Sequence, residues 1–373
     1  MKVFIDGRTF AKPGAGITTF LRCSICAWAN IEPHYQFIVL LTKDFNKDND
    51  SLSFPPNVKL IRLGFFFNHL PNLLSILIAA PYLVRKHKAD VFYAPIPFIP
   101  FFLPHKIKTL IVVHDVVNIE YSKTIEFKNK ISTKFFCKRS IKRAFQIWTN
   151  SYYTKEKVEK YFPIRKCTDI IVGASIDRNV YKQIYVDNIK CRLVKDKYGI
   201  KDKFIIFVGS LEPRKNIPFL LKIIPSIYRK TGVQLVIVGA KGWKNSVIRE
   251  IYNSEEFPKE STIFCGYISN EELAIMYNIA ECFVSASYNE GFGMPQLEAQ
   301  LCGCPVITSD NSAMRELSYR KSGAILIKGY NEDNWEKKII MFLKNRPLVN
   351  LNEYKDFFWE NIMFNVNKSI NQR

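Results

Sequence analysis

The chain has 373 residues, of which 47% are apolar and 24% charged, a globular composition that excludes a disordered protein. At roughly 150 residues per domain, this length predicts two domains. Lysine and arginine (54) outnumber aspartate and glutamate (34), and the charge of +20 favours anionic partners: nucleotide phosphates, nucleic acid or an acidic membrane surface.

Short apolar runs rich in β-branched and aromatic residues recur along the first half of the chain. They lie at residues 3–6, 36–42, 58–63, 90–94, 109–115, 146–151 and 169–173. Continuous apolar strands that alternate with longer segments are typical of a parallel sheet covered by helices on both faces. The first half therefore predicts an α/β, Rossmann-like domain over residues 1–175.

A polar stretch without a strand signal follows, and we expect residues 176–194 to be an interdomain linker. Further strands are predicted at 204–210, 233–239, 262–266, 282–287, 305–310 and 323–327. Helical periodicity appears between several of them, at 218–230, 270–279 and 295–302. The pattern predicts a second α/β domain over residues 195–345. Residues 346–373 are expected to form a C-terminal helix that packs back on the first domain.

Cysteine and histidine spacing bears on redox environment and metals. The nine cysteines show no regular spacing, which argues against a disulfide framework and favours a reducing cytoplasm. The five histidines show no metal-ligand spacing, so no metal site is expected. The chain opens directly into a strand pattern, so we expect no signal peptide. No apolar run reaches the roughly 18–20 residues that span a bilayer.

The basic charge is concentrated in the first half. Between Tyr121 and Lys166 there are thirteen lysines and arginines against three glutamates. Residues 127–145 predict a basic, aromatic helix, which either forms a solvated face, the usual case, or binds an anionic lipid surface. No helix-turn-helix, zinc or RNA-binding signature accompanies this helix, so nucleic-acid binding is not expected.

Two candidate sites follow predicted strands of the first domain. Gly14 and Gly16 precede a helix, but Thr19 stands where a dinucleotide fingerprint has its third glycine. This turn can approach a phosphate, although NAD binding is not expected. His114 ends the strand at 109–115, where it is either a polar contact in a cleft or a satisfied structural histidine.

A third candidate site follows the first strand of the second domain. That strand delivers Gly209, and Arg214 and Lys215 come just before the next helix. A guanidinium and an ammonium at the carboxyl end of a strand are well placed to clamp a diphosphate. A solvated basic loop is an equally good interpretation of this segment by itself.

A fourth candidate site places Glu290 on a loop and Glu298 one turn inside the following helix. Gly291 and Gly293 lie between them and let the backbone come close to a ligand. The free N–H groups of the helix N-terminus, together with the helix dipole, attract anions. An ordinary strand–turn–helix with solvated glutamates fits this spacing equally well.

Together these segments resemble family 4 of the retaining, nucleotide-sugar-dependent glycosyltransferases. Their GT-B fold has two Rossmann-like parallel-sheet domains that face each other across a cleft. The resemblance rests on residues 209–224, 237–245, 263–317 and 357–362, and more loosely on "DGR…GAGI" and "VVHD" in the first domain. The "DGR…GI" and "GAKGW" details look most like mannosyltransferases of bacterial surface-polysaccharide (lipopolysaccharide) assembly.

The resemblance implies a division of roles. Arg214 and Lys215 would hold the diphosphate and stabilise the leaving nucleoside diphosphate, and Glu290 would contact hydroxyls of the transferred sugar. His114 would contact the sugar near the reacting centre, and Glu298 would bind the ribose. The other implied donor-binding residues are Gly14, Gly16, Gly209, Gly266, Tyr267, Ile268, Gly291, Phe292, Gly293 and Met294.

The implied function is the retaining transfer of a hexose to a growing, lipid-linked surface polysaccharide by front-face displacement. Mannose, with GDP-mannose as the donor, is the first choice of hexose. No cofactor or metal is expected beyond the nucleotide sugar, and a UDP-hexose donor is the alternative. The basic helix and the apolar first domain suit a cytoplasmic protein peripheral to the inner face of the plasma membrane. A GT-B epimerase, a phosphorylase-like enzyme and a basic nucleic-acid- or membrane-binding scaffold protein are the rival interpretations.

Overall fold

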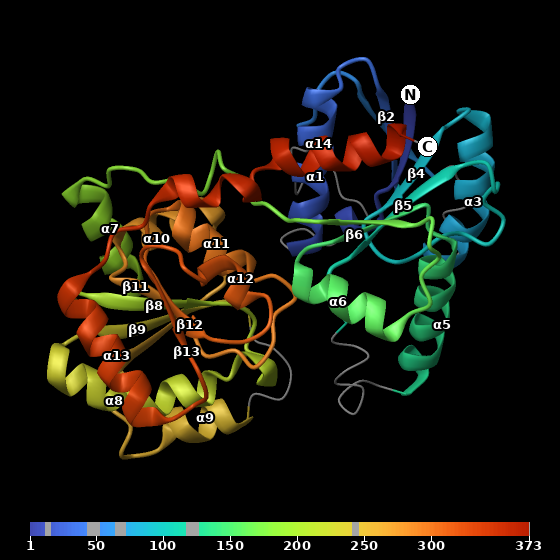
Figure 1. Cartoon of the computed structure of the whole chain (residues 1–373). Helices are drawn as coiled ribbons and strands as arrows, with labels where there is room; N and C mark the ends of the chain where they lie inside the picture. The colour runs from blue at the N-terminus through green and yellow to red at the C-terminus, as the bar shows by residue number, and fades with distance from the viewer. Residues whose placement is uncertain (12–15, 43–52, 64–71, 117–126, 241–245, 373) are drawn as a thin grey trace. The chain divides into compact units, whose positions relative to one another are not determined.

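The computed structural model describes the whole chain except residues 12–15, 43–52, 64–71, 117–126, 241–245 and 373. The chain is divided into two compact units (Figure 1). Unit 1 comprises Met1–Ile176 and Asp356–Arg373, and unit 2 comprises Asp177–Lys355. Each unit contains one parallel sheet with helices alongside.

The sheet of unit 1 is seven-stranded in the described residues, with the strand order β3-β2-β1-β4-β5-β6-β7. All of its neighbouring strands pair in parallel. The strands are β1 (Lys2–Asp6), β2 (Gln36–Leu41), β3 (Val58–Arg62), β4 (Val91–Ala94), β5 (Lys108–Val113), β6 (Gln146–Thr149) and β7 (Asp169–Val172). Every strand predicted in the first half is therefore confirmed. The central strands are continuously buried, because helices cover both faces of the sheet.

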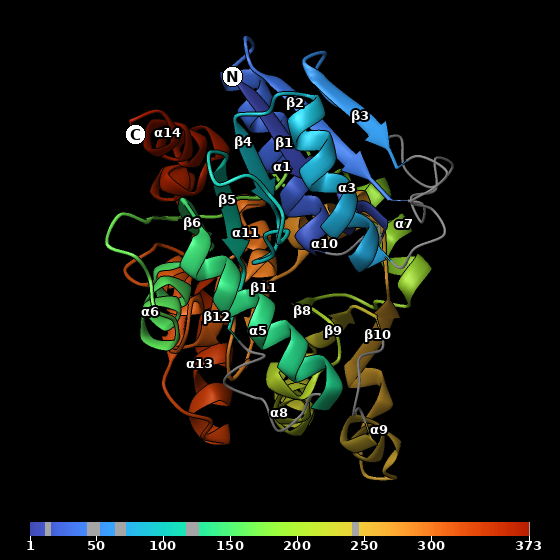
Figure 2. The same cartoon turned by 90° about the vertical axis from the view of Figure 1, so that its right-hand side faces the viewer.

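The helices of unit 1 are η1 (Arg8–Ala11), α1 (Gly16–Ile31), α3 (Asn72–Lys86), α5 (Phe127–Arg143), α6 (Tyr152–Tyr161) and α14 (Trp359–Asn371). Two neighbouring residues of β6 pack against different groups of helices. Ile147 belongs to a core that α3, α5 and α6 cover. Trp148 instead contacts Phe20 of α1 and Trp359 of α14. Figure 2 shows α3 and α5 in front of this sheet.

The C-terminal helix α14 is tied to unit 1 by hydrogen bonds to its sheet. Lys108 Nζ donates to the Ile370 carbonyl at 2.8 Å. Gln146 Nε2 donates to the Val366 carbonyl at 3.3 Å. At the start of the helix, Trp359 Nε1 donates to a backbone carbonyl at the end of the first segment of unit 1. The chain therefore completes the first unit with its last helix.

The described residues of unit 2 form a six-stranded parallel sheet in the order β10-β9-β8-β11-β12-β13. The strands are β8 (Phe204–Val208), β9 (Gln234–Val238), β10 (Thr262–Gly266), β11 (Cys282–Ser285), β12 (Val306–Ser309) and β13 (Ala324–Ile327). The six strands predicted in the second half are confirmed. Strand order reverses beside β8, which is where open α/β sheets place their ligands.

The helices of unit 2 are α7 (Asn188–Tyr198), η3 (Pro213–Lys215), α8 (Ile217–Thr231), α9 (Ser246–Asn253), η4 (Lys259–Ser261), α10 (Asn270–Ile279), α11 (Met294–Leu301), α12 (Met314–Ser318), α13 (Glu332–Asn345) and η5 (Leu351–Phe357), the last of which runs into unit 1. Helices α8, α9 and α13 share one core with the sheet. Figure 1 shows α10, α11 and α12 on the opposite side of that sheet.

The segment predicted as a linker packs against unit 2 and contains most of α7. Asn278 of α10 accepts the Ile184 N–H at 2.8 Å and donates to the Lys182 carbonyl at 3.1 Å. Asp187 then caps α7 by accepting the Lys190 N–H. At the other boundary, residues 346–355 lie with unit 2 rather than with the C-terminal helix.

Among the described residues, none of the helices combines the length and the apolar character that a membrane span requires.

Candidate active site

Glycines end three neighbouring strands of unit 2 and bring their backbones close together. Gly209, Gly239 and Gly266 all have positive φ, at 155°, 149° and 69°. A Cβ on Gly239 would lie 2.1 Å from the Gly209 carbonyl oxygen. No side chain can therefore replace Gly239 without moving the strand end. The three glycines leave the carboxyl edge of β8, β9 and β10 free of side chains at these positions.

The chain then turns through η3, which presents two cations beside that edge. Arg214 and Lys215 precede Asn216, whose left-handed φ of 52° starts α8. Lys215 is buried, and its Nζ lies beside the end of β8, 3.4 Å from the place that a Cβ on Gly209 would occupy. The small residue at 209 thus makes room for the ammonium group.

Both cations bind one carboxylate, that of Glu290, from the loop after β11. Arg214 Nη1 donates to Glu290 Oε2 at 2.7 Å, and Lys215 Nζ donates to Glu290 Oε1. Arg214 Nε also donates to Glu212 at 2.9 Å. The structure therefore brings Arg214, Lys215 and Glu290 together from segments about 75 residues apart in sequence. Two cations and two carboxylates make up this cluster.

The ionisation of the cluster follows from opposing effects. Burial by itself would raise the pKa of Glu290, but Lys215 and Arg214 hold the pKa below its ordinary value. Burial would lower the pKa of Arg214, but Glu290 and Glu212 raise it overall. Glu290 is therefore a carboxylate and Arg214 a guanidinium at neutral pH. A carboxylate stabilised by two cations is a weak proton acceptor.

Glu298 lies on α11 in a different environment from Glu290. Its Oε2 accepts a hydrogen bond from the Tyr277 hydroxyl at 3.2 Å. Burial raises the pKa of Glu298 to about 7, and the Tyr277 hydrogen bond opposes that rise. No salt bridge to Glu298 occurs in the described part of the chain. The two glutamates are thus not an interacting pair: one is fixed as an anion, and the other titrates near neutrality.

The remaining predicted donor-binding residues of unit 2 line strand ends and one helix start. Gly293 has a φ of 95° at the N-cap of α11, and Met294 is the first residue of that helix. Phe292 is buried, so its ring contributes to the core. After β10, Tyr267 is exposed and Ile268 is buried. Gly291 lies in the loop between Glu290 and Phe292. The predicted contacts of these residues with a donor stay predictions.

His114 lies in unit 1, just after β5, and both ring nitrogens have protein partners. Nε2 donates to the Pro95 carbonyl at 2.9 Å, which leaves Nδ1 to accept from Asn150 Nδ2 at 3.0 Å. Phe20 packs edge-on against the ring at 4.9 Å. Burial lowers the pKa of His114 to about 4. The ring is therefore neutral and well held, and its contact with the sugar stays a prediction.

The glycine turn of unit 1 is described only in part. Gly16 is the first residue of α1, and a Cβ placed on it would meet no atom within 4 Å. Gly14 lies outside the described residues. The predicted approach of these glycines to a phosphate therefore stays a prediction.

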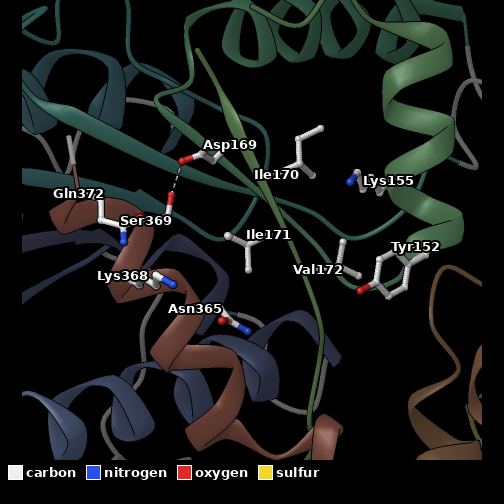
Figure 3. A pocket seen from close by; sticks show the side chains of 10 residues that line it. All are labelled: Tyr152, Lys155, Asp169, Ile170, Ile171, Val172, Asn365, Lys368, Ser369 and Gln372. Carbon is white, nitrogen blue, oxygen red and sulfur yellow. Dashed lines mark hydrogen bonds between the residues drawn. The ribbon is translucent and has the colours of Figure 1, made fainter. Parts of the chain in front are cut away.

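A pocket of about 390 Å³ lies elsewhere in unit 1, at the edge strand β7 (Figure 3). Figure 3 shows Lys155 and Tyr152 of α6 on one side of β7 and Lys368 and Ser369 of α14 on the other. Two of the residues that line the pocket are hydrogen-bonded: Ser369 Oγ donates to Asp169 Oδ2 at 2.7 Å. The pocket shares no residue with the predicted site, so it does not belong to the cluster around Glu290.

Within the described ranges, no group of three or more histidine, cysteine or acidic residues could hold a metal ion. Cys302 and Cys304, at the end of α11, are buried thiols. Burial raises the pKa of both. These cysteines therefore belong to the packing of unit 2.

Comparisons with known proteins give a family match over most of unit 2. The profile described as "Glycosyl transferases group 1" matches residues 193–356, which is most of unit 2. The second unit of this chain is therefore similar to the group 1 glycosyl transferases. It is 26% identical over 299 residues to O-antigen chain mannosyltransferase B of Escherichia coli, covering 74% of this chain and 73% of that protein. It is 25% identical over 217 residues to a serotype-specific mannosyltransferase of the same species, which covers 56% of this chain but 26% of that protein.

The solved structures agree on the fold of this glycosyltransferase. Sucrose-phosphate synthase from Thermosynechococcus elongatus has a TM-score of 0.70 at 17% identity, covering 100% of this chain and 94% of that one. Two parallel Rossmann-like sheets of this kind are the GT-B fold, so the predicted fold class is confirmed. The predicted resemblance to glycosyltransferases of this group is confirmed as well, and the retaining mechanism stays a prediction.

Sequence reasoning missed the polar side chains that surround Glu290. Ser287 donates to Glu290 Oε1 at 3.1 Å, and Ser312 Oγ accepts the Glu290 N–H at 3.1 Å. Asn150, which fixes His114, was missed as well. Serine and asparagine are common in loops, so neither type nor spacing separated these residues from their neighbours.

Proposed function

We propose that this glycosyltransferase transfers a hexose, with retention of configuration, to a growing, lipid-linked surface polysaccharide. Mannose is our first choice of hexose, and GDP-mannose is our first choice of donor. The observation that carries the proposal is the cluster of Arg214, Lys215 and Glu290 at the carboxyl ends of β8 and β11. Two adjacent cations suit a diphosphate, and a buried carboxylate suits sugar hydroxyls. The O-antigen mannosyltransferase relative supports mannose as the first choice of sugar. A UDP-hexose is the alternative donor.

In this proposal the cations act on the leaving group. Arg214 and Lys215 bind the diphosphate and stabilise the negative charge that develops on it as the bond to the anomeric carbon breaks. The acceptor hydroxyl attacks the anomeric carbon from the same face. The new carbon–oxygen bond forms there, and the hydroxyl proton passes to an oxygen of the departing diphosphate.

The proposal gives Glu290 a binding role rather than that of base or nucleophile. Its carboxylate is held by two cations, which lowers its pKa and its basicity. A general base or covalent nucleophile of a glycosidase instead needs a free carboxylate at the reacting carbon. Glu290 therefore accepts hydrogen bonds from hydroxyls of the transferred sugar, while Glu298 accepts from the ribose. No metal or further cofactor is part of this proposal.

The lipid-linked acceptor is supported by the outer surface of unit 1 around α3 and α5. Tyr82, Phe102 and Phe135 are large apolar side chains that are 57%, 74% and 59% exposed. Phe102 belongs to the loop between β4 and β5. Arg139 and Arg143 hold this loop by donating hydrogen bonds to backbone carbonyls of the loop. Aromatic side chains beside arginines are typical of surfaces that bind anionic lipid. We place the protein in the cytoplasm, peripheral to the inner face of the plasma membrane.

Flotation with vesicles tests the membrane part of the proposal by itself. Wild type should float with anionic vesicles more than with neutral ones, and Phe102→Asp should weaken this. Phe364→Asp, at a phenylalanine of α14 that is 64% exposed, is the matched control and should float like wild type. Equal flotation of wild type with anionic and neutral vesicles would reject the anionic surface as partner.

A panel of nucleoside diphosphates and nucleotide sugars tests the donor. Thermal-shift measurements should show a rise in Tm with GDP and GDP-mannose, and turnover with the best donor should then be measured on an acceptor. A rise with UDP and UDP-hexoses alone would select the alternative donor. An epimer or sugar phosphate formed from donor alone would favour the epimerase or phosphorylase. DNA binding that weakens with salt, without any response to nucleotides, would favour the scaffold protein.

A further inference from the structure

The backbone carbonyl of Ser287, three residues before Glu290, accepts hydrogen bonds from three side chains. Ser309 Oγ donates at 2.7 Å, the Tyr330 hydroxyl at 3.0 Å and Asn311 Nδ2 at 3.1 Å. Ser309 ends β12, Asn311 follows it, and Tyr330 follows β13. A carbonyl oxygen has two lone pairs, and these three donors use its full accepting capacity.

The side chain of the same serine contacts the candidate sugar-binding carboxylate. Ser287 is fully buried, and its Oγ donates to Glu290 Oε1 at 3.1 Å. That hydroxyl also lies 3.0 Å from Ser285 Oγ. One residue therefore connects the three donors to the carboxylate that pairs with Arg214 and Lys215.

Asn311 and Tyr330 are hydrogen-bonded to each other, and each has a further contact with the Glu290 loop or its neighbours. Asn311 Nδ2 also donates to the Tyr330 hydroxyl at 3.0 Å. Asn311 Oδ1 accepts from Ser312 Oγ at 3.0 Å, and that oxygen accepts the Glu290 N–H. The Tyr330 ring packs edge-on against Tyr288, in the Glu290 loop, with ring centres 4.9 Å apart.

The Tyr330 ring is also fixed from the side of α8. Its centre lies 5.7 Å from that of Phe219 in an edge-on contact. The hydroxyl is therefore delivered to the Ser287 carbonyl by a ring that two aromatic neighbours hold. Removing the hydroxyl alone leaves these ring contacts in place, which separates positioning from packing.

We propose that Tyr330 and Asn311 are positioning residues that fix the Glu290 carboxylate through Ser287. The inference rests on the proposed role of Glu290 in binding the transferred sugar. Arg214 and Lys215 fix Glu290 from the side of β8, and the Ser287 network fixes it from the side of β12 and β13. Neither Tyr330 nor Asn311 needs to touch the substrate for this role.

Tyr330→Phe tests the proposal through kinetics. We expect kcat to fall about tenfold, since misplacing a positioning group by a fraction of an ångström slows the chemical step. KM for the donor and the Kd of the nucleoside diphosphate should stay within about twofold of wild type, because the cations are untouched. Tyr354→Phe, at a fully buried tyrosine of the same unit outside this network, is the control and should keep wild-type kcat.

A double-mutant cycle with Glu290→Gln decides whether Tyr330 acts through Glu290. If it does, Tyr330→Phe lowers the turnover of wild type but leaves the residual turnover of Glu290→Gln unchanged. An equal fall in both backgrounds would overturn the proposal and leave Tyr330 a structural residue. Asn311→Ala should show the same dependence on the background.

The same cycle measured by thermal unfolding does not depend on turnover. Coupled residues should give Tm changes that are less than additive in the Tyr330→Phe/Glu290→Gln double variant. Additive changes would overturn the positioning network. If wild type transfers no sugar from any nucleotide donor, the proposed function fails, and the Tm cycle still tests the network by itself.

Discussion

Replacing Glu290 by glutamine should make the enzyme bind a free nucleoside diphosphate more tightly while it loses turnover. In the structure the Glu290 carboxylate occupies both cations, with Oε2 at 2.7 Å from Arg214 Nη1 and Oε1 on Lys215. A diphosphate that uses these cations must share them with a carboxylate of the same sign. Glutamine removes the charge and keeps the shape.

The size of this effect follows from the electrostatics of a partly buried site. A phosphate charge about 5 Å from the carboxylate is repelled by about 3 kcal/mol at an effective dielectric constant of about 20. Glu290 also orders the two cations, and its loss offsets part of the gain. We therefore expect a net gain of about 1.4 kcal/mol, which is about tenfold in Kd.

Titration calorimetry with GDP and UDP measures this change directly. Glu336→Gln is the matched control, because Glu336 pairs with Lys230 and Ser226 elsewhere in unit 2. It should leave Kd unchanged. Weaker binding by Glu290→Gln would refute the competition and show that Glu290 chiefly holds the cations in place. A kcat near wild type would reject its role toward the sugar.

Two further predictions concern the pH dependence of stability and follow from the pKa shifts of Glu298 and His114. The pKa of Glu298 is about 7 in the folded state against an ordinary 4.5, so the folded state binds the extra proton and its stability should fall as pH rises through this interval. Glutamine does not titrate, so the Tm of Glu298→Gln minus that of wild type should increase from pH 4.5 to 7. A constant difference would contradict the shift. The folded pKa of His114 is about 4 against 6.5, so the unfolded state binds the extra proton and stability should fall as pH drops from 6.5 to 4. His114→Gln should lack this pH-dependent loss of stability, so its Tm should approach the Tm of wild type as pH falls. A constant Tm difference between the two proteins across this pH range would count against a buried neutral ring.

The fold could be predicted from sequence because its signals are local. Runs such as residues 110–113 and 235–238 are continuously apolar, and buried parallel strands require this on both faces. Glycines at the ends of β8, β9 and β10 likewise mark strand ends in the sequence itself. Helix α7 was missed, because its mean hydropathy is low and much of its surface is exposed.

The candidate site could be predicted only where chemistry and spacing coincide. Arg214, Lys215 and Glu290 stood out as charges at strand ends, although their pairing across 75 residues could not be derived. Tyr330 and Ser287 lie 43 residues apart, and their bond uses a backbone carbonyl that any residue type could supply. His114 could equally have been a free cleft residue, because its partners Pro95 and Asn150 come from other loops.

The central claim is that the cations of unit 2 bind the donor diphosphate. The most direct test measures the Kd of GDP and of GDP-mannose for wild type and for Lys215→Met. Methionine keeps most of the length of the buried side chain, is shorter than lysine by one atom, and removes the charge. Wild type should bind both ligands, and the variant should bind them about 10- to 100-fold more weakly, since a charge-assisted hydrogen bond contributes about 1.5–3 kcal/mol. Unchanged affinity in the variant for the ligands that wild type binds would contradict the account.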